Sequence, residues 1–247
     1  MYTDCEALIL KQVKTLNGRR MIVLFTEKYG KISAGTSISE KGKNKSALAL
    51  RPFTYGRYEL YKNKDNFNIN GAETIDSFFS LGEDVDKYMA ASYALELTDV
   101  LVPEDQPAPG MLNLIHEFLA LLEKRKTNYD TLLVAFMLKT LTLVGTEPNL
   151  SSCQKCGKTE GLTYFSVPDG GLNCKACGSS DQGPNPLIFE VSDGIINVMR
   201  YIKAHPLRSL DGLALPKESE MLLKQILKCY YSYHLGIENL KSEGLRI

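Results

Sequence analysis

Four cysteines near the middle of the chain have the spacing of metal ligands. Cys153 and Cys156 form one C-x2-C pair, Cys174 and Cys177 form a second, and seventeen residues separate the pairs. Each pair lets two thiolates from one tight turn reach the same ion, and together they supply the tetrahedral all-sulfur set that Zn²⁺ accepts. A glycine directly follows each pair and gives the turn the backbone freedom that a metal knuckle needs. The spacing therefore predicts one bound zinc ion.

The alternative use of these four thiols is two disulfide bonds. Disulfides persist in oxidising compartments. The first ten residues contain Asp4 and Glu6 and lack the long apolar run of a secretion signal, so zinc is favoured. A site with sulfur in all four positions leaves no place for water or substrate, and we expect it to be structural. Cys5 and Cys229 lie far from this spacing and are expected to be single thiols.

Groups that could catalyse a reaction are few. The three histidines, His116, His205 and His234, lie in or near segments with helical patterning and have no recognisable nucleophile arrangement around them. The run Gly157–Thr159 resembles the end of a phosphate-binding loop, but Ser152 stands where that loop requires glycine. The sequence therefore predicts that the protein is not an enzyme and has no small-molecule substrate.

One catalytic alternative stays open. Glu83, Asp84 and Asp86 stand together at the expected start of a helix, and clustered carboxylates can hold Mg²⁺ or Mn²⁺ for a nuclease. Acidic residues at this position also interact favourably with the positive end of the helix dipole. The second interpretation is favoured, and a cleavage assay with divalent metal separates the two.

The charge of the chain is unevenly distributed. Residues 1 to 80 carry 13 Lys and Arg against 8 Asp and Glu, and residues 81 to 247 carry 16 against 21, so a net charge of zero hides halves of +5 and −5. Between residues 41 and 64, seven basic residues face only Glu59. Such a segment suits a polyanion, although a solvated loop that keeps the protein soluble has the same composition.

Short strands are expected to position this basic segment. Five runs rich in β-branched, aromatic or aliphatic residues occupy 6–13, 21–26, 31–37, 52–62 and 67–71. Turn residues separate them, at Asn17-Gly18, Tyr29-Gly30 and 63–66. Five short strands predict a small OB-fold barrel over residues 1–80, a fold that binds oligonucleotides but can also act only as a docking platform.

Helical patterning begins after residue 80. Ser80 and Glu83 have the spacing of a capping box, and the helices are expected at 81–102, 111–126, 129–144, 193–204 and 218–235. In the last of these, the apolar residues Leu223, Ile226, Leu227 and Tyr230 share one face, which ends at Gly236. The fold class is therefore predicted to be α+β, with a helical domain over 81–247 that carries the zinc module at about 150–186.

Taken together, these blocks resemble the bacterial RecO family of recombination mediators, and the resemblance covers nearly the whole chain. The blocks are Glu6–Leu10, the turn Glu27–Lys31, the basic loop leading to "LRPF" at 50–53, the helix at 91–104, the two cysteine pairs, and "YYSYHLG" at 230–236 followed by "LKS".

The resemblance implies a function. It implies binding of single- and double-stranded DNA without sequence specificity, annealing of complementary strands, and assembly with RecR. It also implies contact with the acidic C-terminal tail of the single-stranded DNA-binding protein and help in loading RecA onto covered strands. The resemblance also implies a cytoplasmic, nucleoid-associated protein, and no membrane segment is expected. A module that bridges only proteins is the alternative, and a gel shift at low and high salt distinguishes them.

The DNA contacts are expected on the barrel, where Lys and Arg displace counterions from phosphates. Phe53 and Tyr55 are candidates for base stacking, although barrel core is favoured for both. Many family members carry arginines in the loop after the third strand, and this chain has lysines, which keep the charge but lose bidentate geometry. The expected phosphate contacts are Lys11, Arg19, Arg20, Lys41, Lys43, Lys45 and Arg51.

Overall fold

The computed structural model describes residues 1–15, 20–39, 45–64, 66–178 and 187–245. Within them the chain forms two compact units, one of Met1–Lys124 together with Gly244 and Leu245, and one of Arg125–Glu243. Strands dominate the beginning of the first unit and helices the second, so the α+β class is confirmed. The first unit contains two long helices besides the strands, so the domain boundary expected at residue 80 stays a prediction.

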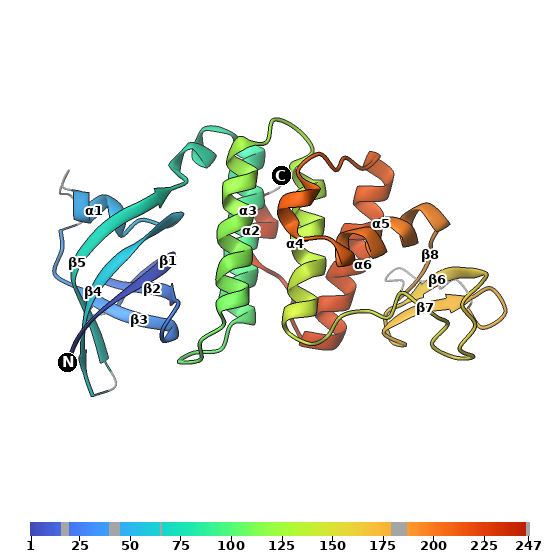
Figure 1. The fold of residues 1–247 in the computed structure, drawn as a ribbon, viewed down its shortest axis with the longest axis horizontal. Coiled ribbons are helices and arrows are strands. Elements are labelled where there is room, and N and C mark those ends of the chain that lie inside the picture. Colours follow the sequence, from blue (N-terminus) through green and yellow to red (C-terminus); the bar gives the residue numbers. More distant parts are fainter. Residues whose placement is uncertain (16–19, 40–44, 65, 179–186, 246–247) are drawn as a thin grey trace. The chain divides into compact units, whose positions relative to one another are not determined.

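The first five strands close into a barrel, drawn in blue to teal in Figure 1. Their order is β1-β2-β3-β5-β4, all neighbours are antiparallel except β3 and β5, and a short helix α1 (Lys45–Ala49) follows β3. This is the arrangement of an OB-fold, as predicted. The strands are β1 (Tyr2–Lys14), β2 (Arg20–Thr26), β3 (Gly30–Thr36), β4 (Thr54–Asn63) and β5 (Asn66–Ser77).

The barrel interior is filled by side chains that alternate along the strands. On β4, Tyr58 and Leu60 are fully buried, whereas Arg57 and Glu59, which alternate with them, are exposed. Because successive side chains point to opposite faces of a strand, this alternation fixes the register of β4. Ile9 of β1 and Leu24 of β2 belong to the same core cluster.

The tight turn between β2 and β3 is built as its sequence indicates. Thr26 Oγ1 accepts a hydrogen bond from the Tyr29 amide (2.9 Å) and donates one to the Gly30 carbonyl (2.9 Å). Gly30 has φ +70°, and a Cβ there would lie 2.0 Å from the Gln106 carbonyl oxygen, so only glycine fits. The predicted reversal after Asn63 is also present, whereas Asn17-Gly18 lies outside the described residues.

The predicted capping box at Ser80 is wrong. Residues Phe79–Glu83 form a 3-10 turn (η1), and helix α2 (Val85–Leu101) begins later, with Asp84 as its N-cap. The Asp84 carboxylate accepts hydrogen bonds from the amides of Asp86 (2.9 Å) and Lys87 (3.1 Å), so the helix-end interpretation of this acidic cluster is confirmed for Asp84. The Ser80 hydroxyl instead donates to Glu123 in α3 (Pro109–Lys124), which packs against α2.

The second unit is centred on a helix that is apolar on all sides. Consecutive residues from Thr131 to Leu138 of α4 (Tyr129–Leu143) are buried, because α5 (Asp193–Ala204) and α6 (Lys217–Leu235) both pack against it. The four apolar residues predicted to share a face of α6 are buried, and Gly236 ends the helix at φ +65° as predicted. No described helix has both the length and the hydropathy needed to cross a membrane.

A small antiparallel sheet belongs to the same unit and was not predicted. Its strands β6 (Leu162–Ser166), β7 (Gly171–Cys174) and β8 (Ile188–Glu190) have the order β7-β6-β8. The fully buried Phe165 meets Tyr230 of α6 edge to face, with ring centroids 6.0 Å apart. This contact ties the sheet to the helical core and gives the cysteines a fixed base.

Candidate metal centre and nucleic-acid interface

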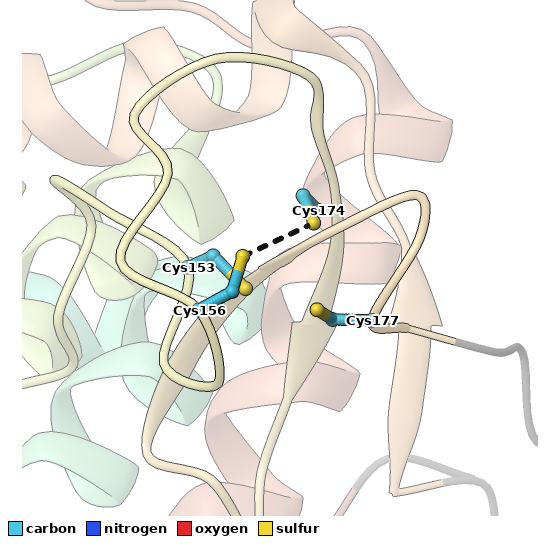
Figure 2. Close-up of side chains that lie close together, drawn as sticks. All are labelled: Cys153, Cys156, Cys174 and Cys177. Atoms are coloured by element: carbon cyan, nitrogen blue, oxygen red, sulfur yellow. Dashed lines mark hydrogen bonds between the residues drawn. The ribbon is translucent and has the colours of Figure 1, made fainter.

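The four predicted cysteines converge on one point (Figure 2). Their sulfur atoms all lie within 4.8 Å of one another, and Cys156 Sγ is 3.7 Å from Cys174 Sγ. A disulfide requires sulfurs about 2.05 Å apart, so the thiols are not bonded. We refer to Cys153, Cys156, Cys174 and Cys177 as the cysteine cluster; within the described residues it is the only group of this kind that could hold a metal ion.

Two turns of similar construction hold the cluster. In the first, the Gly157 amide donates to the Cys153 carbonyl (2.9 Å), and Gly157 has φ +75°, a conformation that favours glycine. In the second, the amides of Cys177 and Gly178 both donate to the Cys174 carbonyl (3.0 and 2.8 Å). The Gln154 amide donates to the Leu172 carbonyl (2.8 Å), which fastens the first turn to β7. Both pairs are therefore positioned by local backbone hydrogen bonds.

The thiols do not share the same protonation behaviour. Burial acts to raise the pKa of the Cys153 thiol, but backbone hydrogen bonds from Cys174, Cys156 and Lys155 outweigh it and bring the pKa to about 6. Hydrogen bonds to the sulfurs of Cys156 and Cys174 raise the pKa of the Cys177 thiol to about 12. The pKa values of two adjacent thiols are therefore shifted in opposite directions, as expected where neighbouring negative charges repel one another.

The donor set fits a tetrahedral metal ion. Sulfurs bound at about 2.3 Å from Zn²⁺ lie about 3.8 Å apart, close to the 3.7 Å between Cys156 and Cys174. The surroundings are polar: Cys153 Sγ lies 3.6 Å from Asn173 Oδ1, and Asn173 Nδ2 donates to Asp169 (2.6 Å). With four sulfur donors the site would be filled, leaving no position for a substrate. The structure therefore contains four cysteines able to hold a metal ion structurally.

Three of the predicted DNA contacts meet at a pocket of the first unit. Lys11, Arg20 and Arg51 come from β1, β2 and the segment before β4, and all three line a cavity of about 590 Å³. We refer to this cavity as the barrel pocket. Lys11 also forms a salt bridge with Asp99 of α2 and has a side chain 51% exposed.

The other predicted contacts have different positions. Lys45 is exposed at the start of α1, and Arg19, Lys41 and Lys43 lie outside the described residues. Tyr55 is half-buried: its hydroxyl donates to Glu6 Oε2 (2.8 Å) and its ring packs on His116 at 4.4 Å between centroids. Phe53 instead lines the barrel pocket, so the favoured prediction that both rings belong to the barrel core is wrong. Whether any of these residues contacts DNA stays a prediction.

Sequence reasoning missed two aromatic residues of the barrel pocket. Phe79 of η1 and Tyr88 of α2 line it beside Phe53, and they are 38% and 43% exposed. The available signal was an aromatic residue, Tyr88, next to Lys87 near the start of a helix whose apolar residues are otherwise mostly alanine and leucine. Nothing local to Phe79 indicated that it faces the same cavity.

The histidines are each engaged in contacts of the fold. His116 Nε2 lies 2.9 Å from Asp76 Oδ2, His205 Nδ1 lies 2.9 Å from the Tyr201 carbonyl, and His234 Nε2 lies 2.7 Å from the Val167 carbonyl. None of these partners is a nucleophile. The geometry around them supports a structural role.

A five-stranded OB-fold barrel with a basic pocket is typical of proteins that bind nucleic acids, and here it precedes a helical unit with four cysteines able to hold a metal ion. The family can be named from the comparisons. The family model described as Recombination protein O N terminal matches residues 1–78, and the model Recombination protein O C terminal matches residues 82–244. The chain belongs to the RecO family, as the sequence resemblance predicted.

Similar curated proteins are called DNA repair protein RecO. The protein from Alkaliphilus metalliredigens is 30% identical over 98% of this chain and 97% of its own length. The protein from Bacillus subtilis is 27% identical over 96% of this chain and 91% of its own length, and that from Oceanobacillus iheyensis is 26% identical over 96% and 90%. The chain is therefore a member of a DNA repair and recombination family along nearly its whole length.

Proposed function

We propose that the protein is a recombination mediator that binds single- and double-stranded DNA without sequence specificity and anneals complementary strands. With RecR, it helps to load RecA onto single strands that are covered by the single-stranded DNA-binding protein. It would act on DNA in the cytoplasm, at the nucleoid. The observation that carries the proposal is the gathering of Lys11, Arg20 and Arg51 around one pocket of an OB-fold in a chain of the RecO family.

The physical basis of annealing is charge neutralisation. Cations that replace condensed counterions on the phosphates bind any sequence, and they reduce the repulsion between two strands brought together. The first 80 residues have a net charge of +5, which supports contact with polyanions. Neither binding nor annealing needs a reaction step, so the proposal requires no catalytic rate and no nucleotide hydrolysis.

The partner contacts belong to the proposal as expectations from the family. The second half of the chain has a net charge of −5, which disfavours DNA and leaves its surface available to proteins. RecR and the acidic tail of the single-stranded DNA-binding protein are the proposed partners. A surface separate from the DNA site would let the protein find strands that are already covered.

The metal ion proposed for the cysteine cluster is one Zn²⁺ with a structural role. The support is the all-cysteine donor set and the distance of 3.7 Å between Cys156 Sγ and Cys174 Sγ. Zinc supplies folding free energy in such sites, because the ion binds the folded arrangement of four thiolates and the unfolded chain has no such site. The turns at the two cysteine pairs hold the four sulfurs in place, so a bound ion would stabilise the helical unit.

Annealing of covered strands tests the proposed function. Complementary strands labelled with a fluorophore and a quencher are covered with the cognate single-stranded DNA-binding protein and mixed with this protein without ATP. We expect quenching well above the uncatalysed rate, and a slower rate when the C-terminal tail of the covering protein is deleted. Annealing no faster than the uncatalysed reaction, or a requirement for ATP, contradicts the mediator function; an unchanged rate after tail deletion contradicts only the tail contact.

A further inference from the structure

The barrel pocket has walls that combine cations with exposed aromatic rings. The cations Lys11, Arg20 and Arg51 were described above; the rings belong to Phe53, Phe79 and Tyr88. Its volume of about 590 Å³ is within the range of about 300–1,000 Å³ that small ligands occupy. All six side chains belong to the first unit, so the pocket is built within one compact body.

Hydrogen bonds hold the segment that carries Arg51 and Phe53 in place. The carbonyl of Ala49 accepts from the Tyr58 hydroxyl (2.7 Å), that of Leu50 from Gln12 Nε2 (2.6 Å), and that of Phe53 from the Phe78 amide (3.0 Å). Donors from three separate parts of the chain thus fix the segment 49–53, which contains Arg51 and Phe53. A pocket fixed in advance loses little conformational entropy when a ligand binds.

Two of the cations lack a carboxylate partner among the residues that the structure describes. Arg20 donates to Gln12 Oε1 (3.2 Å) and to the Ile38 carbonyl (3.2 Å), which are both neutral. The guanidinium of Arg51 lies 6.0 Å from the centre of the Phe79 ring and is exposed. Their positive charges are therefore available to an anion, whereas the charge of Lys11 is shared with Asp99.

The rings present apolar faces that the fold does not cover. Phe79 and Tyr88 are 38% and 43% exposed, and Tyr88 meets Phe53 edge to face at 5.8 Å between centroids. Phe53 has φ +65°, a conformation that is costly for an aromatic residue. The strained backbone and the exposed rings both cost stability, and a ligand that stacks on the rings would recover part of it.

We propose that the barrel pocket binds one unpaired nucleotide of a DNA strand, with the base against Phe79 and Tyr88 and its phosphate toward Arg20 and Arg51. This inference rests on the proposed DNA binding and adds a subsite that distinguishes single strands from duplex. A base within a duplex is stacked on both faces and costs a few kcal/mol to extrude. The pocket therefore favours unpaired DNA, whereas the surrounding cations bind both forms.

The experiment removes the rings and the bases separately. The double variant Phe79→Ala Tyr88→Ala is compared with the wild type for binding to oligothymidylate, to an abasic deoxyribose-phosphate strand of equal length, and to duplex. We expect the wild type to bind oligothymidylate about tenfold more tightly than the abasic strand, the effect of one stacked base. The variant should bind both strands alike, with duplex affinity unchanged.

A matched variant and a spectroscopic signal separate stacking from loss of structure. Phe79→Tyr Tyr88→Phe keeps both rings and should bind like the wild type, and the melting temperatures of all variants should agree. With 2-aminopurine in the strand, the wild type should change the fluorescence of the base, and the alanine variant should not.

Three results overturn the subsite. One is an equal loss of affinity of the double variant for oligothymidylate and the abasic strand; another is no loss for either. The third is binding of an acidic peptide that depends on Phe79 and Tyr88 while DNA binding does not, which assigns the pocket to a protein tail. In all three the wild type still binds DNA, so the proposed function stands; if it binds no DNA, both fail.

Discussion

The cysteine cluster and the barrel pocket are opposite kinds of site. In the cluster, two of the four donors, Cys153 and Cys174, are buried, and all four sulfurs face one another within 4.8 Å. In the barrel pocket the cations and rings are partly exposed and surround a cavity of about 590 Å³. One metal ion could bind all four sulfurs of the cluster, whereas the charges and ring faces of the barrel pocket are open to a ligand.

This difference leads us to expect that the cluster stabilises the fold and that the pocket exchanges ligands. A closed set of ligands contributes folding free energy and has no open position for chemistry. Exposed cations around a fixed cavity bind weakly to any one phosphate and release it readily as salt rises. Changes in the cluster should therefore act on stability, and changes in the pocket on binding.

The largest expected effect comes from removing one ligand of the cluster. Cys174→Ser should abolish stoichiometric zinc and lower the stability of the helical unit by about 4 kcal/mol or more, because loss of a structural metal belongs to the most damaging substitutions. Cys174 is only 4% exposed, so the remaining thiolates would be left without their shared cation. Elemental analysis and thermal unfolding measure both quantities.

The control for this variant is Cys229→Ser, since Cys229 is outside the cluster. It should keep one zinc per chain and a melting temperature close to that of the wild type. Wild-type protein purified without chelator that contains no zinc, or a Cys174→Ser variant as stable as the wild type, would show that the cluster is not a structural metal site.

An intermediate effect is expected when cations of the pocket are removed. Lys11→Ala Arg51→Ala should weaken binding to every single-stranded sequence by a similar factor. The slope of log affinity against log salt should become shallower by about 0.7 for the loss of Arg51 and by less for Lys11, whose charge is shared with Asp99, because each full phosphate contact contributes about 0.7 on single strands. Titrations at several salt concentrations measure both effects, and the melting temperature should change little because both side chains are exposed.

The matched control removes one lysine and one arginine from the helical unit. Arg208 and Lys217 are exposed there, so Arg208→Ala Lys217→Ala changes the net charge equally. Its affinity and salt slope should equal those of the wild type. If the two double variants reduce affinity equally, DNA responds to total charge and the pocket has no special role.

The cysteine cluster could be predicted because its geometry is local. Cys153 and Cys156, like Cys174 and Cys177, are placed by single turns with their own backbone hydrogen bonds. The sheet that joins the turns was missed, since β6, β7 and β8 have only 5, 4 and 3 residues and too little periodicity to be recognised.

The barrel pocket could be predicted only in part because its walls are assembled by tertiary contacts. Charge indicated Lys11, Arg20 and Arg51, but only the closed barrel places them at one cavity. Phe79 and Tyr88 belong to η1 and α2, where the sequence suggested a single helix from residue 81. The error at Ser80 has the same origin, because its hydroxyl bonds to Glu123, a residue distant in sequence.

The smallest expected effect concerns Glu220, a buried carboxyl of the helical unit. It tests whether the stability of that unit depends on the cysteine cluster alone. Glu220 is 4% exposed, and burial raises the pKa of its carboxyl above the usual value of 4.5, as does the neighbouring Asp130; Lys217 and Lys224 oppose the shift. Because the pKa is higher in the folded protein, the contribution of Glu220 to stability is complete below its unfolded pKa and is lost as pH rises through the folded value.

Glu220→Gln should therefore remove this loss. Its melting temperature should exceed that of the wild type by a few degrees at neutral pH, and the difference should shrink as the pH falls through the raised pKa of Glu220 and vanish below about 4.5, where the wild-type carboxyl is protonated in the folded and the unfolded state. Glu218→Gln, an exposed position on the same turn of α6, is the control and should follow the wild type. Thermal unfolding across this pH range, with zinc content measured in parallel, is the test. A gain in melting temperature that is independent of pH would mean that the glutamine acts by packing. A changed zinc content would mean that Glu220 and the cysteine cluster are coupled.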